Sequence, residues 1–274
     1  MEITGLVNDD ILASINERIE RPLNTLTVNG RKGYVQLGNI RFLGNTLSWG
    51  RDIIDIYTNP FLINLCDKYT NNEVHLSNFR IYRTLPSKSK GHVMNWHLDN
   101  KTDVYDFERE EFITKVVPMD KGIILIMYLS DVEDGGFQIV EGSHKWVVDE
   151  AQETWDHEQD KFKDQVVTFN NRKKGTAIIY DYRCIHRAKP YAKGKIRTSL
   201  FGQYSPAWMP VGEPILLNTR DLVGVSETAK RVLNFGKAPS TENWPIGKKS
   251  EVINDLKMGE VVKHLVKKEI QRFV

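Results

Sequence analysis

The middle of the chain, from about residue 75 to residue 205, consists of short segments rich in Ile, Val, Tyr and Phe. Clusters of Gly, Pro, Asn, Asp and Lys separate these segments, which is the pattern of strands joined by turns. Many short strands at turn-punctuated spacing are typical of an antiparallel double sheet or jelly roll. We therefore expect a mainly β fold with flanking helices. The predicted strands lie near residues 75–84, 92–97, 122–130, 136–140, 165–169, 175–180 and 196–204.

Both ends of the chain predict helices rather than strands. Apolar residues recur at helical spacing over residues 8–20 and again over residues 51–70, where Pro60 interrupts the second run. Near the C-terminus, residues 250–274 place apolar side chains at approximate helical intervals, and Ser250 stands where a cap would begin the helix. We expect this last helix to pack against the sheet or against a second copy of the protein.

The length of 274 residues fits one large domain with a buried core, or two small domains. The sequence has no internal repeat and no low-complexity tract, so a single domain over residues 1–274 is the simplest interpretation. Within it we expect a helical N-terminal part, a jelly-roll core and a C-terminal extension with the terminal helix. These parts correspond to residues 1–74, 75–205 and 206–274.

Charge and cysteine content argue against several kinds of partner and compartment. The 38 Lys and Arg residues nearly balance the 36 Asp and Glu residues, so a net charge of +2 gives no electrostatic case for a nucleic acid or a membrane surface. No stretch approaches the roughly 18 apolar residues of a membrane span, and the first residues lack the basic start of a signal peptide. Cys66 and Cys184 show neither metal nor disulfide spacing. We expect a cytoplasmic protein, monomer or homodimer, that acts on a small molecule.

The segment GHVMNWHLDN carries the first two residues of a predicted metal site. His97 and Asp99 are two residues apart, and because strand side chains alternate between faces, both can point into one cavity. His186, in DYRCIHRAKP, is the best third ligand. Two imidazoles and one carboxylate leave adjacent coordination positions free, as an iron(II) oxygenase needs to bind a chelating cosubstrate and dioxygen together. Zinc more often takes a closed or nearly closed tetrahedron.

A predicted anion site follows the third ligand along the chain. Arg197 lies 11 residues after His186, and in IRTSLFGQY it shares a strand face with Ser199. An arginine can hold a carboxylate with two parallel hydrogen bonds, and the serine hydroxyl can add a third. This pair suits the distal carboxylate of 2-oxoglutarate.

Four ordered features of the sequence resemble the phytanoyl-CoA dioxygenase family of 2-oxoglutarate oxygenases. They are WHLD, LSDVEDGGFQIVEGSHK, GTAIIYDYRCIH and the downstream Arg197, and together they cover roughly residues 75–205. The second is the most specific, because an acidic turn, a Gly-Gly reversal, a short strand and then GSHK have no general structural reason to follow one another. The resemblance does not extend to residues 1–70, 100–120 or 205–274, where the elements that shape the substrate site should differ.

The resemblance implies a double-stranded β-helix, which is a jelly roll of the cupin-like kind. It implies iron(II), 2-oxoglutarate as cosubstrate and O2, with release of succinate and CO2. By position in the motifs, His97, Asp99 and His186 become the iron ligands, while Arg197 with Ser199 becomes the clamp for 2-oxoglutarate. The substrate does not follow from the family, whose substrates are diverse.

Three further side chains are weaker predictions. Asn95 shares strand parity with the predicted ligands and is placed to donate to the iron-binding end of the cosubstrate. Arg80 and Tyr82 alternate in NFRIYRTLP and could reach the cavity, Tyr82 to meet the cosubstrate and Arg80 the substrate. A surface-facing edge strand would explain the same alternation.

The segment of residues 100–118 follows directly after Asp99 and has two interpretations. Its length and its aromatic residues suit a lid over the site, with Tyr105 and Phe107 against the substrate. Its acidic residues equally suit a solvated hairpin.

Two functions are consistent with these patterns. The first is an iron(II)- and 2-oxoglutarate-dependent dioxygenase that hydroxylates a small polar metabolite. The alternative is a non-catalytic jelly-roll protein that binds a metal or a ligand, which the loss of a metal ligand or of Arg197 would favour. All four residues are present.

Overall fold

The computed structural model describes most of the N-terminal four fifths of the chain. Among these residues, no helix combines the length and apolar character that a membrane crossing requires. The described helices are α1 (Asp9–Asn24), α2 (Arg51–Tyr57), α3 (Pro60–Thr70), α4 (Val148–Phe162) and α5 (Glu227–Val232). The described residues are 1–24, 34–37, 40–44, 46–86, 95–99, 101–106, 111–116, 121–189, 196–209 and 217–235.

The strands of this part of the chain form one large and two small sheets, with every pairing antiparallel. The large sheet has the order β1 (Glu2–Ile3), β10 (Ala177–Asp181), β7 (Ile123–Tyr128), β12 (Arg197–Pro206), β4 (Val74–Thr84), β3 (Ile40–Leu43) and β2 (Tyr34–Leu37). The second sheet has the order β11 (His186–Ala188), β8 (Phe137–Val140) and β9 (Val166–Thr168). The hairpin β5 (Lys101–Asp106) and β6 (Glu111–Val116) stands apart.

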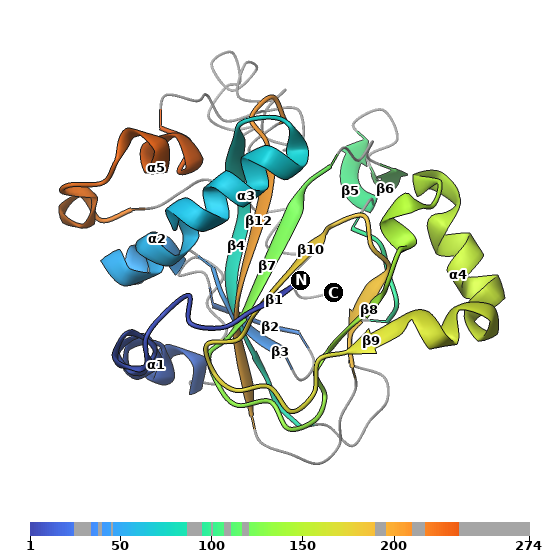
Figure 1. Cartoon of the computed structure of the whole chain (residues 1–274), viewed down its shortest axis with the longest axis horizontal. Coiled ribbons are helices and arrows are strands. Elements are labelled where there is room, and N and C mark those ends of the chain that lie inside the picture. The colour runs from blue at the N-terminus through green and yellow to red at the C-terminus, as the bar shows by residue number, and fades with distance from the viewer. Residues whose placement is uncertain are drawn as a thin grey trace, which may run out of the picture.

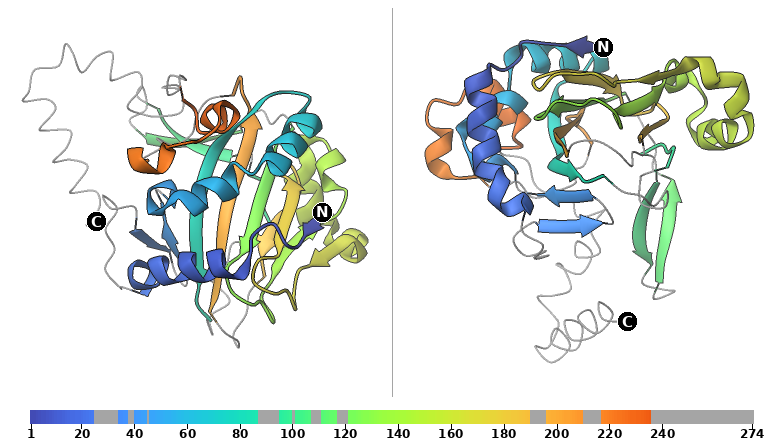
Figure 2. Two further views of the ribbon diagram at one scale, coloured as in Figure 1. Left: turned by 60° about the vertical axis from the view of Figure 1, so that its left-hand side comes forward. Right: turned by 90° about the horizontal axis from the view of Figure 1, so that it is seen from below.

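The elements are arranged in layers. Helices α1, α2, α3 and α5 cover one face of the large sheet, and the sheet β11–β8–β9 lies beyond its other face with α4 outside it (Figure 1). Seen from below, the helices and the smaller sheet lie on opposite sides of the large sheet (Figure 2). This is a mainly antiparallel jelly roll with flanking helices, so the predicted fold class is confirmed.

Alternation along the central strands explains why both faces of the large sheet are covered. On β7, Leu125 and Met127 belong to the apolar cluster under the helices, whereas Ile124 belongs to the cluster between the two sheets. The strand IILIMY is mainly apolar because other elements cover both of its faces along most of its length. A third cluster, which includes Trp155 of α4 and Ile185, packs behind the smaller sheet.

The predicted helical run over residues 51–70 is two helices, as Pro60 suggested. The side chain of Asn59 accepts hydrogen bonds from the backbone N–H groups of Phe61 (3.0 Å) and Leu62 (3.4 Å). Pro60 then occupies the first turn, where a missing N–H costs nothing. The helix α3 ends at Asn71, which adopts the left-handed conformation with a φ of 52°.

Several elements differ from the sequence prediction. The N-terminal part is not purely helical, since it contains the hairpin β2–β3, and α4 and α5 were not expected. The described part of the predicted strand 92–97 holds only a single bridge, at His97. Residues 92–94 and the predicted helix 250–274 lie outside the described residues. The division of the domain into three parts stays a prediction.

Gly202, in the centre of β12, provides a test of the packing between sheet and helices. A Cβ atom at this position would lie 2.6 Å from Cε1 of Tyr57, whose hydroxyl donates to the carbonyl of Phe201 at 2.7 Å. We expect Gly202→Ala to lower the free energy of unfolding by about 1–3 kcal/mol through overpacking. Urea-induced unfolding of the wild type and the variant measures this loss of free energy. The double variant with Tyr57→Leu should lose less than the sum of the two single changes, and additive losses would contradict the clash.

Candidate metal centre and its cavity

A pair of backbone hydrogen bonds brings the two predicted histidine ligands together. The N–H of His97 donates to the carbonyl of His186, and the N–H of His186 donates to the carbonyl of His97, each at 3.0 Å. This antiparallel bridge joins the described residues before β5 to the start of β11. The two imidazole rings consequently lie side by side, with centroids 4.3 Å apart.

Backbone carbonyls orient both rings in the same way. Nδ1 of His97 lies 2.7 Å from the carbonyl oxygen of Asn95, and Nδ1 of His186 lies 2.9 Å from the carbonyl oxygen of Cys184. Because a carbonyl only accepts, Nδ1 of each neutral ring carries the proton. The Nε2 atom of each ring is then left with its lone pair, which is the form that binds a metal ion.

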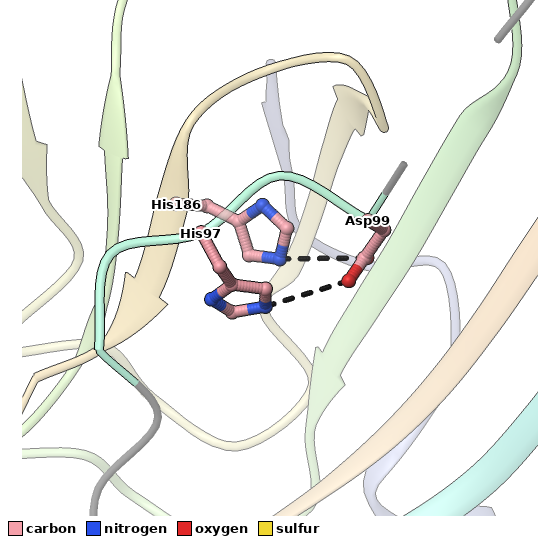
Figure 3. Close-up of side chains that lie close together, drawn as sticks. All are labelled: His97, Asp99 and His186. Carbon is pink, nitrogen blue, oxygen red and sulfur yellow. Dashed lines mark ion pairs between the residues drawn. The ribbon is translucent and has the colours of Figure 1, made fainter. Parts of the chain in front are cut away.

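Asp99 completes the cluster from a turn that follows the bridge. Nε2 of His97 lies 3.4 Å from Oδ1 of Asp99, and Nε2 of His186 lies 3.6 Å from Oδ2 (Figure 3). One ligand atom from each residue falls within 4.8 Å of the others. Two imidazole nitrogens and one carboxylate oxygen, converging and already in the right tautomers, fit a divalent transition metal. The donor atoms of these three residues therefore fit the expected iron(II) ion.

Burial and charge shift the three pKa values in different directions. Burial alone would lower the pKa of His97, but the hydrogen bond and charge of Asp99 outweigh it and the pKa is raised. Burial lowers the pKa of His186, and the charge of Asp99 offsets this only in part. Burial would raise the pKa of Asp99, yet the neighbouring His186, His97 and the guanidinium of Arg80 bring it below its usual value. Asp99 is thus an ionised carboxylate, and the imidazole of His186 is neutral.

The cluster opens into a cavity of about 390 Å³. Arg197 lies in its wall, 7% exposed, and its Nη2 donates to Oγ1 of Thr84 at 3.3 Å. Ser199 lines the same cavity, two residues further along β12. Apart from the three cluster residues, its polar lining side chains are Asn78, Arg80, Tyr82, Thr84, Tyr128, Tyr180, Arg197, Ser199 and Gln203.

The weaker predicted residues have different places. Arg80 and Tyr82 both line the cavity, and the edge-strand interpretation is wrong because β4 lies between β12 and β3. Asn95 is exposed and is not among the lining residues, and it contacts His97 through its backbone carbonyl. Tyr105 stands opposite Phe112 in the β5–β6 hairpin, and its side chain is outside the described part.

The hairpin interpretation of residues 100–118 agrees with β5 and β6, while a lid function stays a prediction. Phe107 lies outside the described residues.

Tyr180 is a cavity residue that sequence analysis missed. Its ring centroid lies 5.4 Å from that of His186, and within the described residues its buried hydroxyl has no hydrogen-bond partner. Burial, and next the charge of Asp99, raise its pKa well above the ordinary value, so the hydroxyl stays protonated. In the sequence, Tyr180 is two residues after Ile178 on the strand before His186, so both side chains lie on the same face of that strand. This spacing does not reveal that the face lines a cavity.

Comparison with known proteins decides the family. The sequence profile described as Phytanoyl-CoA dioxygenase (PhyH) matches residues 50–199, which is more than half of the chain. The chain belongs to the phytanoyl-CoA dioxygenase family. The predicted resemblance is confirmed, and membership assigns the protein to the iron(II)- and 2-oxoglutarate-dependent enzymes that use O2.

Solved structures share the fold of this family member at low sequence identity. HygX from Streptomyces hygroscopicus, with nickel and 2-oxoglutarate bound, has 16% identity and a TM-score of 0.55 over 77% of this chain and 84% of its own. The epimerase SnoN, from nogalamycin biosynthesis, in complex with Fe3+, alpha ketoglutarate and nogalamycin RO, has 16% identity and a TM-score of 0.55, covering 78% and 82%. The carbocyclase SnoK, from the same biosynthesis, has 14% identity and a TM-score of 0.55, covering 76% and 79%. A search of curated protein sequences found no match.

The raised pKa of His97 predicts how metal binding depends on pH. A metal ligand must be unprotonated, so protons compete with the metal below the pKa of His97, which lies above the ordinary value of about 6.5. We expect manganese(II) affinity to fall about tenfold per pH unit below that pKa, with release of one proton on binding. Electron paramagnetic resonance titrations at a series of pH values measure the manganese(II) affinity. The exposed His157 offers a control, since His157→Ala should leave the profile unchanged. Affinity that is constant from about pH 8 to pH 6 would contradict this protonation scheme.

Proposed function

We propose that the protein is a hydroxylase that acts on a small polar metabolite with iron(II), 2-oxoglutarate and O2, and that His97, Asp99 and His186 hold the iron. The observation that carries this proposal is the convergence of the two Nε2 atoms and the carboxylate, with both Nδ1 atoms fixed by backbone carbonyls. Such second contacts orient metal-bound histidines in proteins generally. No rearrangement of the rings is needed before a metal binds.

In this proposal Arg197 holds the distal carboxylate of 2-oxoglutarate. Its guanidinium is buried in the cavity wall, where charge-assisted hydrogen bonds are strong, and Ser199 stands beside it on β12. Tyr82 is the register partner of Ser199 across β4 and β12, so its side chain can contact the same cosubstrate. A contact from the side chain of Asn95 stays a prediction.

When bound, the iron with 2-oxoglutarate and O2 supplies the oxidation, and 2-oxoglutarate leaves as succinate and CO2. The residues of this chain contribute position and exclusion of water. The cavity has apolar walls between its polar groups, formed by Phe137, Ile126 and Phe201. A reactive centre enclosed by such walls is shielded from side reactions with solvent.

Two further observations support a small-molecule enzyme. HygX binds nickel and 2-oxoglutarate, and SnoN binds Fe3+, alpha ketoglutarate and nogalamycin RO, so related folds hold both a metal with this cosubstrate and an organic ligand. Both cysteines are buried free thiols, which supports our proposal of a cytoplasmic location. Action without nucleic acid, as a monomer or homodimer, is part of the same proposal.

Turnover of 2-oxoglutarate tests the reaction class. We expect the iron-loaded protein to form succinate from 2-oxoglutarate and O2, with stimulation by extracts that contain its substrate. His186→Ala should abolish both iron retention and succinate formation, because two ligands cannot hold the metal open on one face. Succinate is measured by mass spectrometry, and His157→Ala is the matched control. Full binding of iron and 2-oxoglutarate without succinate in any extract would instead support the non-catalytic binding protein.

Arg197→Leu tests the clamp. Removal of a buried bidentate partner should weaken 2-oxoglutarate binding by about 2–4 kcal/mol, which is roughly 30- to 700-fold. Iron affinity should change little, since Arg197 is not part of the metal cluster. Calorimetry measures the two constants separately, with iron added to the metal-free protein and 2-oxoglutarate added to the metal-loaded protein. If 2-oxoglutarate binds the variant as tightly as the wild type, another residue is the clamp.

A further inference from the structure

The floor of the cavity is a ladder of paired residues on β4 and β12. Register pairs Thr84 with Arg197 and then Tyr82 with Ser199, and we call these two rungs the cosubstrate end. The next two rungs pair Arg80 with Phe201 and Asn78 with Gln203, and we call them the far end. All eight side chains line the cavity.

The ladder is longer than the cosubstrate. The last rung lies six positions beyond Arg197 on β12, which is roughly 20 Å along a strand. A chain of five carbons that is held at Arg197 spans only part of this length. The far end therefore remains available to a second ligand.

A third strand pairing brings Tyr180 to the far end. Ile124 of β7 is the register partner both of Gln203 on β12 and of Tyr180 on β10. Tyr180 thus stands in the same row as Asn78 and Gln203, across the sheet. The row is polar at both ends, and Tyr180, Gln203 and Asn78 line the same cavity as His97, Asp99 and His186.

Two atoms of that row are buried without a partner. Oδ1 of Asn78 and the hydroxyl of Tyr180 are both enclosed, and neither has a hydrogen-bond partner within the described residues. Buried polar atoms in folded proteins are almost always paired, and an exception needs an explanation. Both residues line the cavity, so a bound molecule with its own polar groups could pair these atoms after a small side-chain movement.

The far end also carries a positive charge. Among the described residues that line the cavity, the guanidiniums are those of Arg80 and Arg197, and the carboxylate is that of Asp99. Arg80 is held over the ring of Phe42, 5.5 Å from its centroid, which keeps the guanidinium at a fixed place in the wall. Arg197 serves the cosubstrate under the proposed function, on which this step rests. Arg80 is the other guanidinium of the cavity lining and stands at the far end, where its charge also acts on Asp99.

We propose that the far end is the substrate subsite and that it selects a small anionic molecule, whose carboxylate or phosphate group binds Arg80. The same molecule donates a hydrogen bond to Asn78 and is hydrogen-bonded by Tyr180. Because Tyr180 packs against His186, its hydroxyl sets the distance between the substrate and the metal cluster. Tyr180 is therefore a positioning residue, and Arg80 determines the charge of the substrate.

Simple anions test the subsite without knowledge of the substrate. The protein is loaded with manganese(II), saturated with 2-oxoglutarate, and titrated with 13C-labelled acetate or with inorganic phosphate. Manganese(II) speeds the nuclear relaxation of any anion that binds nearby. We expect enhanced relaxation of at least one of the two anions, and the anion with the larger enhancement indicates whether the substrate carries a carboxylate or a phosphate. In Arg80→Gln the enhancement should fall at least about tenfold, as expected for the loss of a charged hydrogen bond.

Two variants serve as controls for this titration. Arg80→Lys keeps the charge and should retain most of the enhancement. Arg220→Gln removes an equal charge from a side chain that is 80% exposed and should behave like the wild type. Manganese(II) and 2-oxoglutarate binding, measured in the same samples, show that each variant is folded.

The outcomes separate the two proposals. Failure of the wild type to bind manganese(II) or 2-oxoglutarate overturns both the proposed function and the subsite. Normal binding of these two, with no enhancement for either anion, overturns the subsite alone. An enhancement that Arg80→Gln leaves unchanged also overturns it, because the anion is then bound to the metal rather than to Arg80.

Thermal stability tests the unpaired hydroxyl independently. Tyr180→Phe should leave the melting temperature of the ligand-free protein unchanged or raise it, because no protein hydrogen bond is lost. Tyr204→Phe is the matched control, since its hydroxyl donates to the carbonyl of Tyr57 at 2.7 Å, and it should melt about 2–4 °C lower. An equal loss in Tyr180→Phe would show that the hydroxyl already has a partner and would remove it from the proposed subsite.

Discussion

The two backbone hydrogen bonds between His97 and His186 are the constraint on which the metal cluster depends. They join segments that are 89 residues apart and make the two histidines direct neighbours across an antiparallel bridge. Each imidazole then meets the carbonyl two residues before it in its own segment, from Asn95 on one side and Cys184 on the other. The arrangement is the same on both sides of the bridge. One pairing thus sets the spacing, the tautomers and the direction of both rings.

The cavity depends in turn on an irregularity in β4. Between Gln203 and Tyr204 of β12 the register shifts, so that Ser77 has no partner on the neighbouring strand. Asn78 faces the cavity, whereas Leu76, two residues before it, packs in the cluster under the helices. The hydroxyl of Ser77 remains paired, at 2.8 Å from Oγ of Ser205. The bulge therefore ends the polar floor at Asn78 and returns β4 to an apolar environment without leaving its own hydroxyl unsatisfied.

The features that sequence predicted well are those that follow from local periodicity. Alternation and turn residues located the central strands, and the break at Pro60 divided two helices. The pairing of His97 with Asp99 followed from strand parity, yet Asp99 lies in a turn after a single bridge residue. The expected cluster is present because the chain reverses there, which parity did not describe.

The features that sequence missed depend on contacts between distant segments. The helix α4 is mainly polar and shows a narrow apolar stripe, with Ala151 and Trp155 against the smaller sheet. For β2 and β3, four residues each are too few to show a period. Periodicity assigns Asn78 and Tyr180 to a face of a strand, but only the assembled sheets determine that this face lines a cavity. The sequence feature that could have pointed to the cavity is the presence of polar residues within strands that are otherwise apolar.

The three side chains of the candidate metal site differ in exposure, and the difference shows from which side solvent reaches the site. The side chain of His186 is 7% exposed, that of His97 is 25% exposed and that of Asp99 is 34% exposed. The cluster is therefore closed behind His186 and open beside Asp99. The hairpin β5–β6 begins at Lys101, two residues after Asp99, the most exposed of the three residues. A cation bound by the carboxylate of Asp99 would therefore lie on the open side of the cluster, close in sequence to the start of the hairpin.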